Sequence, residues 1–578
     1  MDKENEELIF SPSDLTLYME SPFASWMNHY ATLYPEVLQE ADQQDEMMLL
    51  LQKKGVTHET EMIDILQSGG LKVTNLSGVK NARNETLKAM RQGADVIYQA
   101  ALEVLPFRGY ADFLVKVSGA SDLGDYHYEA WDTKLSKSVK PYFVIQLCCY
   151  AEMLATLQGR CPKSIVVILG NKDRMRFNTD NYYYYYLQLK KLFLSVHLNF
   201  NSENRPDPSD STSWGRWGNF AEQLLLEVDH LSQVANITRS QIKKLNQADI
   251  KTMQSLVDKD IQRVPGLTSN VLMRLKSQAK IQKDSIGQDK PLFKIIISEL
   301  NQKQGLSLLP PHSPLDVFFD IEGFPLEDGG LEYLWGCAYF NVDGVRQFKD
   351  FWAHNKNEEQ QAFKEFIEWV YARWKEDPTM HIYHYANYEI AACRKLMGRY
   401  GICEYEVDQL LRNEVFVDLY KIVKSGLLLG EPKYSIKNVE RLYRGIRKTD
   451  IKSGGDSVVI YENWRENPDG NNWEDSKLLN FIREYNIDDC NSTQELVGWL
   501  REKQAEYSIK YNGKNEILET EINETITECI QLRNELLKRL SHLENENNCD
   551  EKLIEIFAWS LEFHRRENKP VFWRYFDR

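Results

Sequence analysis

Hydrophobic residues recur along the chain with two spacings, which together predict two regions where strands and helices alternate. Residues 108–117 and 126–134 alternate as β-strands do and flank a polar loop, which predicts a β-hairpin. Residues 315–323, LDVFFDIEG, read as an apolar strand that ends in two acids. Helical spacing follows each strand region, at residues 138–157 and at residues 363–374. We therefore expect an α/β protein with two separate α/β units.

Three segments of different composition stand beside these units. Residues 201–218 are rich in serine, aspartate, proline and asparagine, which is typical of a linker. Residues 219–285 have helical spacing and contain two short repeats, VANITRSQIKKL and VPGLTSNVLMRLKSQA. Residues 506–578 are charged and helical in spacing, so we expect a packing or docking helix pair there.

Composition narrows the class of protein. A chain of 578 residues is long enough for two to four domains, and none of its apolar runs is long enough to cross a membrane. Nine cysteines without C-x-x-C spacing indicate reduced thiols, so we expect a soluble, cytoplasmic protein without membrane contact. The net charge of −16 argues against non-specific nucleic-acid binding, although a local basic groove can coexist with it.

The strand at residues 315–323 carries the first candidate chemistry. Residues two apart on a strand point to the same side, so Asp320 and Glu322 can hold one cation between them. Burying two like charges side by side is costly unless a metal ion or a proton neutralises them. The strand end is therefore a candidate metal site, and the alternative is an exposed strand end whose carboxylates are merely solvated.

The predicted hairpin carries a second set of polar residues. Asp132 and Lys134 are two apart on one strand, and Asp112 can meet them from the other. Such a carboxylate pair can hold a divalent ion, while the lysine positions or activates the attacking water and stabilises developing charge. Gln146 and Tyr150, four apart, share one face of the helix that follows. The alternative is an ordinary hairpin with a surface ion pair.

This order, D…D-x-K followed by Q-x-x-x-Y, resembles the RecB-like nucleases of the PD-(D/E)xK superfamily over residues 8 to about 200. Six residues fall on that family's motif positions: His58, Asp112, Asp132, Lys134, Gln146 and Tyr150. The resemblance implies that the first three are metal ligands, the lysine is catalytic, and the last two support the site or contact DNA. We expect the histidine on the first turns of a helix. No iron–sulfur cluster is expected, because Glu20, Ser21 and Pro22 stand where some relatives have a cysteine.

A second motif order runs through residues 294 to about 505. After D-x-E on the strand, Glu389 opens a helix behind the predicted strand 381–385. Tyr485 and Asp489 lie four apart on the helix predicted over residues 478–499. Asp488 is an alternative to Asp489, although it faces about 100° away on the helix.

These three motifs resemble the DEDD exonucleases, which have an RNase H-like fold. The resemblance implies a site for two divalent ions, Mg²⁺ or Mn²⁺, with four carboxylate ligands: Asp320, Glu322, Glu389 and Asp489. It also implies that Tyr485 orients the attacking water. Glu389 stands where most of that superfamily has aspartate, and its longer side chain can still reach a metal.

The two repeats of the middle segment resemble helix-hairpin-helix elements. In such elements a tight turn presents backbone N–H groups to a phosphate at a helix N-terminus. Gly266 occupies such a turn, so we expect it to contact nucleic acid. A purely structural helical spacer accounts for the pattern equally well.

The expected order is a PD-(D/E)xK restriction-endonuclease-like nuclease over 1–200, a linker and helix-hairpin-helix-like connector over 201–290, an RNase H-like exonuclease domain over 291–505, and a helical C-terminal region over 506–578. The resemblances imply a metal-dependent nuclease acting on DNA single strands or ends, in repair or antiviral defence, with RNA not excluded. The sequence has no G-x-x-x-x-G-K-[ST] motif, so we expect either a separate helicase or ATPase partner or a chain that works without one. The alternative is a non-catalytic subunit in which one or both nuclease folds only bind nucleic acid or a partner.

Overall fold

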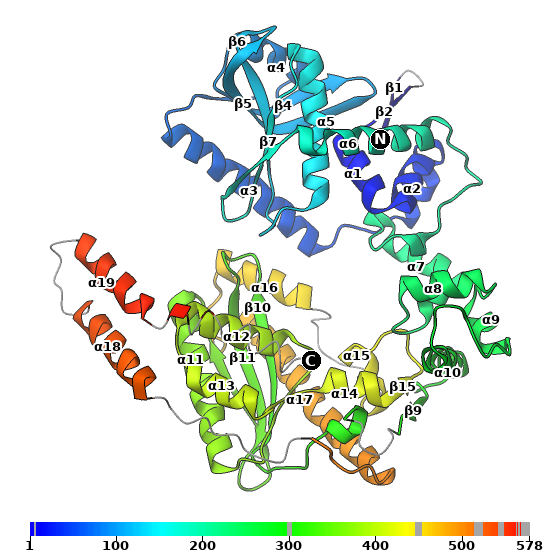
Figure 1. Ribbon diagram of the computed structural model, residues 1–578, viewed down its shortest axis with the longest axis vertical. Helices are drawn as coiled ribbons and strands as arrows, with labels where there is room; N and C mark the ends of the chain where they lie inside the picture. The colour runs from blue at the N-terminus through cyan, green and yellow to red at the C-terminus, as the bar shows by residue number, and fades with distance from the viewer. Residues whose placement is uncertain are drawn as a thin grey trace. The chain divides into compact units, whose positions relative to one another are not determined.

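The chain forms two units, Met1–Ala279 and Lys280–Arg578, each built around its own sheet (Figure 1). The computed structural model describes residues 1–4, 7–297, 303–445, 454–513, 524–540, 548–561, 563, 564 and 567. We treat each unit by itself.

A six-stranded sheet, in the order β3-β4-β5-β6-β7-β8, organises the first unit. Its strands are β3 Val73–Asn75, β4 Val96–Val104, β5 Phe107–Ser121, β6 Gly124–Thr133, β7 Ser164–Ile168 and β8 Arg174–Asn178. Strands β5 and β6 pair antiparallel, which confirms the predicted hairpin. Strand β7 runs parallel to β6, and the helix between them, α5 Pro141–Gln158, is the crossover.

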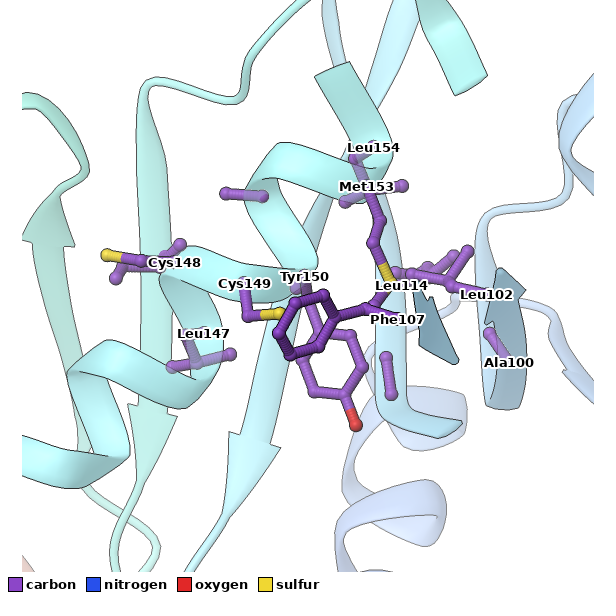
Figure 2. Packing of buried hydrophobic residues seen from close by; sticks show 14 of the residues in the cluster. Ala100, Leu102, Phe107, Leu114, Leu147, Cys148, Cys149, Tyr150, Met153 and Leu154 are labelled. Carbon is purple, nitrogen blue, oxygen red and sulfur yellow. The ribbon is translucent and has the colours of Figure 1, made fainter. Parts of the chain in front are cut away.

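Helices cover both faces of this sheet. On one face, Leu147, Tyr150 and Leu154 of α5 pack with Phe107 and Leu114 of β5 (Figure 2). The opposite face packs against α3 Glu46–Ser68. Because residues alternate along β6, its last side chains point in turn toward α5 and toward α3. These two helices carry the remaining candidate polar residues of the first unit.

Helix α3 begins earlier than the sequence pattern indicated. Asp45 caps it by accepting the N–H of Met48 at 2.7 Å, and the helix continues through Gly55. His58 therefore lies in the middle of the helix, so the prediction that it lies on the first turns is wrong. A glycine inside a helix costs only about 1 kcal/mol, which packing of the apolar residues further along α3 can offset.

The remaining elements of the first unit are short strands and helices: β1 Asp2–Glu4, β2 Glu7–Ile9, α1 Pro12–Glu20, α2 Pro22–Leu33, α4 Ala82–Arg91, α6 Asp180–Leu198, α7 Gly218–Glu227, α8 Arg239–Gln247, α9 Met253–Asp258, and α10 Ser269–Ser285 at the boundary. Helices α8 to α10 enclose a small apolar core of their own, with Leu245, Leu256 and Leu272.

The segment 201–218 is docked and does not behave as a free linker. Trp217 is fully buried, and its indole donates to Asn28 Oδ1 of α2 at 2.9 Å. The backbone N–H of Gly218 donates to Asp42 Oδ2 at 2.7 Å. The polar composition concealed this packing because one large buried side chain can anchor a segment whose other residues are exposed.

A five-stranded sheet, in the order β12-β11-β10-β13-β14, organises the second unit. Its strands are β10 Val317–Phe324, β11 Leu331–Phe340, β12 Arg346–Trp352, β13 Ile382–His384 and β14 Phe416–Asp418. The strands predicted at residues 315–323 and 381–385 are confirmed. At the start of this unit, β9 Phe293–Ile295 pairs with β15 Leu427–Leu429 in a separate two-stranded sheet.

Strand β10 divides its side chains between two environments. Val317, Phe319 and Ile321 point into a core formed with α11, α12 and α13. Asp320 and Glu322 alternate with them, so they face the other side, where α17 packs on β10 and β11 (Figure 1). The helices of this unit are α11 Lys356–Glu376, α12 Tyr388–Tyr400, α13 Glu404–Arg412, α14 Leu419–Gly426, α15 Ile436–Val439, α16 Gly454–Glu466, α17 Lys477–Glu506, α18 Glu524–Leu540 and α19 Asn548–Ser560.

The predicted C-terminal helix pair is present as α18 and α19, while residues 568–578 lie outside the described residues. Across the part of the chain that the structure describes, no helix is both long and apolar enough to span a bilayer.

Candidate metal-binding sites

Three carboxylates meet on the α17 side of the second sheet. Asp320 and Glu322 come from β10 and Asp489 comes from α17, and one oxygen from each lies within 4.8 Å of the others. Alternation along the strand brings the first two together, and the packing of α17 on β10 adds the third. The structure therefore brings together three of the four acids that the motif order predicted.

The environment of Glu322 is unfavourable to a bare negative charge. Burial, together with the nearby Asp489 carboxylate, raises the pKa of Glu322 to about 8. Its Oε2 accepts a hydrogen bond from the Ser457 hydroxyl of α16 at 2.7 Å. Three carboxylates at this spacing repel one another, and an all-oxygen donor set suits a hard divalent cation such as Mg²⁺ or Mn²⁺. The residues present thus fit the metal that the sequence implied.

Tyr485 lies one helical turn before Asp489 on α17. Its side chain is buried, and burial followed by the charge of Asp489 raises its pKa well above the usual range, so the hydroxyl stays protonated. The Nζ of Lys437 lies 5.7 Å from the centre of the Tyr485 ring, and its positive charge acts on the Glu322 carboxylate. The site therefore combines acids, a hydroxyl donor and a cation.

Asp488 and Asp489 are separated by their position on the helix. Asp488 faces away from the other acids, and its Oδ1 forms an ion pair with Arg444 at 2.7 Å. Asp489 is the one that joins the group. The placement of the two side chains favours Asp489, whose role as a metal ligand stays a prediction.

Glu389 lies outside this group of three. It is buried at the start of α12, where its Oε2 lies 3.3 Å from Nδ1 of His384. Among the described residues, neither that oxygen nor either ring nitrogen of His384 has a hydrogen-bond partner. Such an unsatisfied buried carboxylate oxygen is unusual, and a bound cation would satisfy it.

The structure adds three residues that the sequence reasoning did not single out as site residues: Ser457, Lys437 and Asn486. Asn486 follows Tyr485 directly, so its position beside a motif residue was a usable signal. Ser457 comes from α16, and no spacing in the sequence connects it to the D-x-E strand.

The candidate site of the first unit lies at the end of β6. Lys134 Nζ pairs with Asp132 Oδ2 at 2.6 Å. The Thr133 backbone N–H and hydroxyl both donate to Asp112 Oδ2 at 2.8 Å. Burial, and then the charge of Asp112, raises the pKa of Asp132 to about 7 despite the lysine. The two aspartates and the lysine are therefore close together, as the hairpin predicted.

The two residues of the Q-x-x-x-Y motif have different surroundings. The Gln146 amide donates to Asp132 Oδ1 at 3.4 Å, so it lies beside the acids. The Tyr150 ring lies in the apolar core of α5 (Figure 2). Its hydroxyl donates to the Tyr110 carbonyl at 2.6 Å. This placement fits the expected role in support of the site, and contact with DNA stays a prediction.

His58 does not join the two aspartates in one tight group. Within the described ranges, His58, Asp112 and Asp132 form no cluster with ligand atoms inside 4.8 Å. Burial lowers the pKa of His58, which keeps its imidazole neutral. Glu59 of the same helix is instead close enough to Asp112 that, after burial, the charge of Asp112 raises its pKa. The sequence placed Glu59 beside His58 without assigning it a role.

Gly266 forms the turn before α10. Its φ is +78°, a conformation that favours glycine, and its carbonyl accepts from Lys244 Nζ at 2.9 Å. Asn236 occupies the matching position of the other repeat with φ of +63°. The two repeats therefore share a turn geometry, while their contact with nucleic acid stays a prediction.

Comparison with known families adds to this geometry. A family model described as the RNase H superfamily matches residues 317–501. The matched segment runs from the start of β10 into α17 and includes all three clustered acids and Tyr485. None of the curated proteins matches the chain. Residues 317–501 are therefore an RNase H-like domain, a nuclease fold that carries an acidic group able to bind a divalent metal.

Proposed function

We propose that the chain is a divalent-metal-dependent nuclease that hydrolyses phosphodiester bonds of DNA at single strands or ends. The observation that carries the proposal is the meeting of Asp320, Glu322 and Asp489 within 4.8 Å inside an RNase H-like domain. A nuclease fold implies a nucleic-acid partner, and the three carboxylates favour Mg²⁺ or Mn²⁺ as cofactor.

The proposal gives each residue of this site a role. The three clustered carboxylates would hold the metal, which supplies Lewis-acid stabilisation of the phosphoryl oxygens when bound. The Tyr485 hydroxyl, kept protonated by its surroundings, would orient the attacking water as a donor. Glu389 would join the other acids after its side chain turns away from His384.

We extend the proposal to a second candidate site, in the first unit, because of the environment of the Asp132 carboxylate. A fully buried carboxylate whose pKa is raised to about 7, paired with Lys134, is the kind of perturbed cluster found at functional sites. We propose a RecB-like PD-(D/E)xK site in which Asp112, Asp132 and His58 bind metal. Lys134 would activate or position water, and Gln146 would orient Asp132.

The biological setting is part of the same proposal. We propose a role in DNA repair or antiviral defence in the cytoplasm, where DNA ends or single strands are processed. Because the sequence has no P-loop motif, any strand separation would depend on a separate helicase or ATPase.

The test is cleavage of end-labelled single- and double-stranded DNA and RNA by the purified chain, with Mg²⁺, with Mn²⁺ and with EDTA. To isolate the RNase H-like domain, the comparison uses the Asp132→Asn background. Adding Asp320→Asn should lower metal-dependent DNA cleavage about a hundredfold or more, because loss of even an outer-shell partner lowers activity about 10- to 100-fold.

Asp343→Asn is the matched control, since Asp343 is an exposed aspartate of the turn between β11 and β12. It should leave cleavage unchanged. If the wild-type chain binds DNA but cleaves neither DNA nor RNA with either metal, the nuclease proposal is wrong and the chain is a binding subunit.

A further inference from the structure

Asn486 is a buried amide placed directly against the acid cluster. It lies on α17 next to Tyr485, none of its surface is exposed, and its Nδ2 donates to Asp320 Oδ2 at 2.8 Å. Building on the proposed function, we propose that Asn486 is a positioning residue that holds the Asp320 carboxylate in its metal-binding orientation. We further propose that Gly336 supplies the space that this amide occupies.

A neutral amide suits this task better than a charged group. A lysine or arginine at this place would neutralise Asp320 and compete with a metal for it. An amide fixes the carboxylate through one oxygen and leaves the negative charge uncompensated. Asp320 has two oxygens, so the second oxygen can serve as a ligand while the first accepts from Asn486.

Gly336 explains how α17 can bring the amide so close. It lies directly opposite Asp320 in the antiparallel pairing of β10 and β11. A Cβ built on Gly336 would lie 1.6 Å from Asn486 Oδ1 and 2.8 Å from Cζ of Phe348. Its backbone is that of an ordinary strand, so glycine is needed there for space and not for conformation.

A neighbouring contact holds the helix at the same point. The Cys490 thiol, one turn after Asn486, donates to the Gly336 carbonyl at 3.2 Å. Helix α17 is therefore anchored to β11 at Gly336, a residue that has no side chain. Adding even a methyl group at Gly336 would have to displace the amide, because the Cys490 contact keeps the helix close to β11 at this point.

The experiment measures Mn²⁺ binding by calorimetry and DNA cleavage in parallel, with every variant carrying Asp132→Asn so that the first unit does not contribute. Asn486→Ala should weaken Mn²⁺ binding about 10- to 100-fold, the usual effect of losing a group that orients a metal ligand. Gly336→Ala should weaken it by a similar factor. The Gly336→Ala, Asn486→Ala double variant should be no worse than Asn486→Ala, because the two changes remove the same contact.

Asn491→Ala is the matched control, since Asn491 is a partly buried asparagine further along the same helix. It should bind Mn²⁺ like the parent. Circular dichroism checks the fold of each variant, and if Asn486→Ala does not fold, Gly336→Ala still tests the proposal because it keeps the amide in the chain.

The outcomes separate this inference from the proposed function. If Asp320→Asn leaves Mn²⁺ binding unchanged, the metal site itself is wrong. If binding depends on Asp320 but Asn486→Ala matches the parent, the positioning role is wrong while the site stands. Fully additive losses in the double variant would overturn the assignment of Gly336.

Discussion

The charge of Glu322 links the stability of the second unit to pH. In the unfolded chain this side chain loses its proton near its ordinary value of 4.5, whereas in the folded chain burial keeps it protonated to about pH 8. Between these values the folded state binds more protons, so the free energy of unfolding falls as pH rises. This contribution is fully present below about pH 4.5 and is lost as pH rises through about 8.

We therefore expect the unfolding temperature in EDTA to fall between about pH 5 and pH 8, and Mg²⁺ to raise it more at the upper end. The measurement is a thermal melt at several pH values with and without Mg²⁺. The pKa of Asp132 in the first unit is also raised, so this residue makes the stability depend on pH in the same direction. The Glu322→Gln variant is therefore needed to isolate the contribution of Glu322. If Glu322→Gln leaves the pH dependence unchanged, Glu322 is not its source.

At the residue scale, three of the four acids predicted to converge lie together, and the side-chain orientations were not predicted. Alternation along β10 placed Asp320 and Glu322 on one face, and the resemblance of the motif order to DEDD exonucleases added Asp489. The orientation of Glu389 toward His384 depends on packing around α12, which no local pattern encodes. Ser457 reaches Glu322 from α16, a contact set by the tertiary arrangement alone.

At the scale of elements, Trp217 anchors a segment that the composition describes as a linker. Removing a large buried side chain destabilises its surroundings by about 3–5 kcal/mol. We expect Trp217→Ala to release residues 201–218 from α2 and to speed tryptic cleavage at Arg205 and Arg216. The measurement is the cleavage rate by mass spectrometry under limiting trypsin.

Tyr184→Ala provides the comparison, because Tyr184 is an aromatic residue of the same unit that is 80% exposed. It should leave the cleavage rate at both arginines unchanged. Equal cleavage of Trp217→Ala and the parent chain would mean that other contacts, such as the hydrogen bond between Gly218 and Asp42, hold the segment.

The sequence predicted helices and strands well where the hydrophobic pattern was long. It did not predict where a helix begins at a cap, or which distant strand a short strand pairs with. The hairpin of β5 and β6 and the long helix α17 follow directly from their spacing. Helix α3 starts at its Asp45 cap, well before its apolar stripe becomes clear. Strand β9 pairs with β15, which is more than a hundred residues away in sequence, so its place could not follow from local pattern.

At the scale of the whole molecule, each unit carries a candidate site of its own, so we expect the two to act independently. Asp132→Asn should leave stepwise release of mononucleotides, the behaviour that the resemblance to DEDD exonucleases implies. Asp320→Asn should leave longer oligonucleotide products from the first unit. The measurement is a denaturing-gel product ladder for the parent, both single variants and the double variant.

Each variant must first pass a check of folding, and the double variant should release no products above background. If Asp320→Asn alone removes every product, the first unit is silent. If mononucleotide release survives Asp320→Asn unchanged, that activity does not come from the RNase H-like domain.

The two faces of strand β10 serve different purposes, which limits how the strand can change in evolution. Its odd-numbered residues fill the core beneath α11 to α13, while Asp320 and Glu322 face α17. A one-residue insertion or deletion within the strand would exchange the two sets, driving carboxylates into the core and phenylalanine into the acid site. Substitutions can therefore change the site gradually, but a register slip in this strand would remove the fold and the chemistry in a single step.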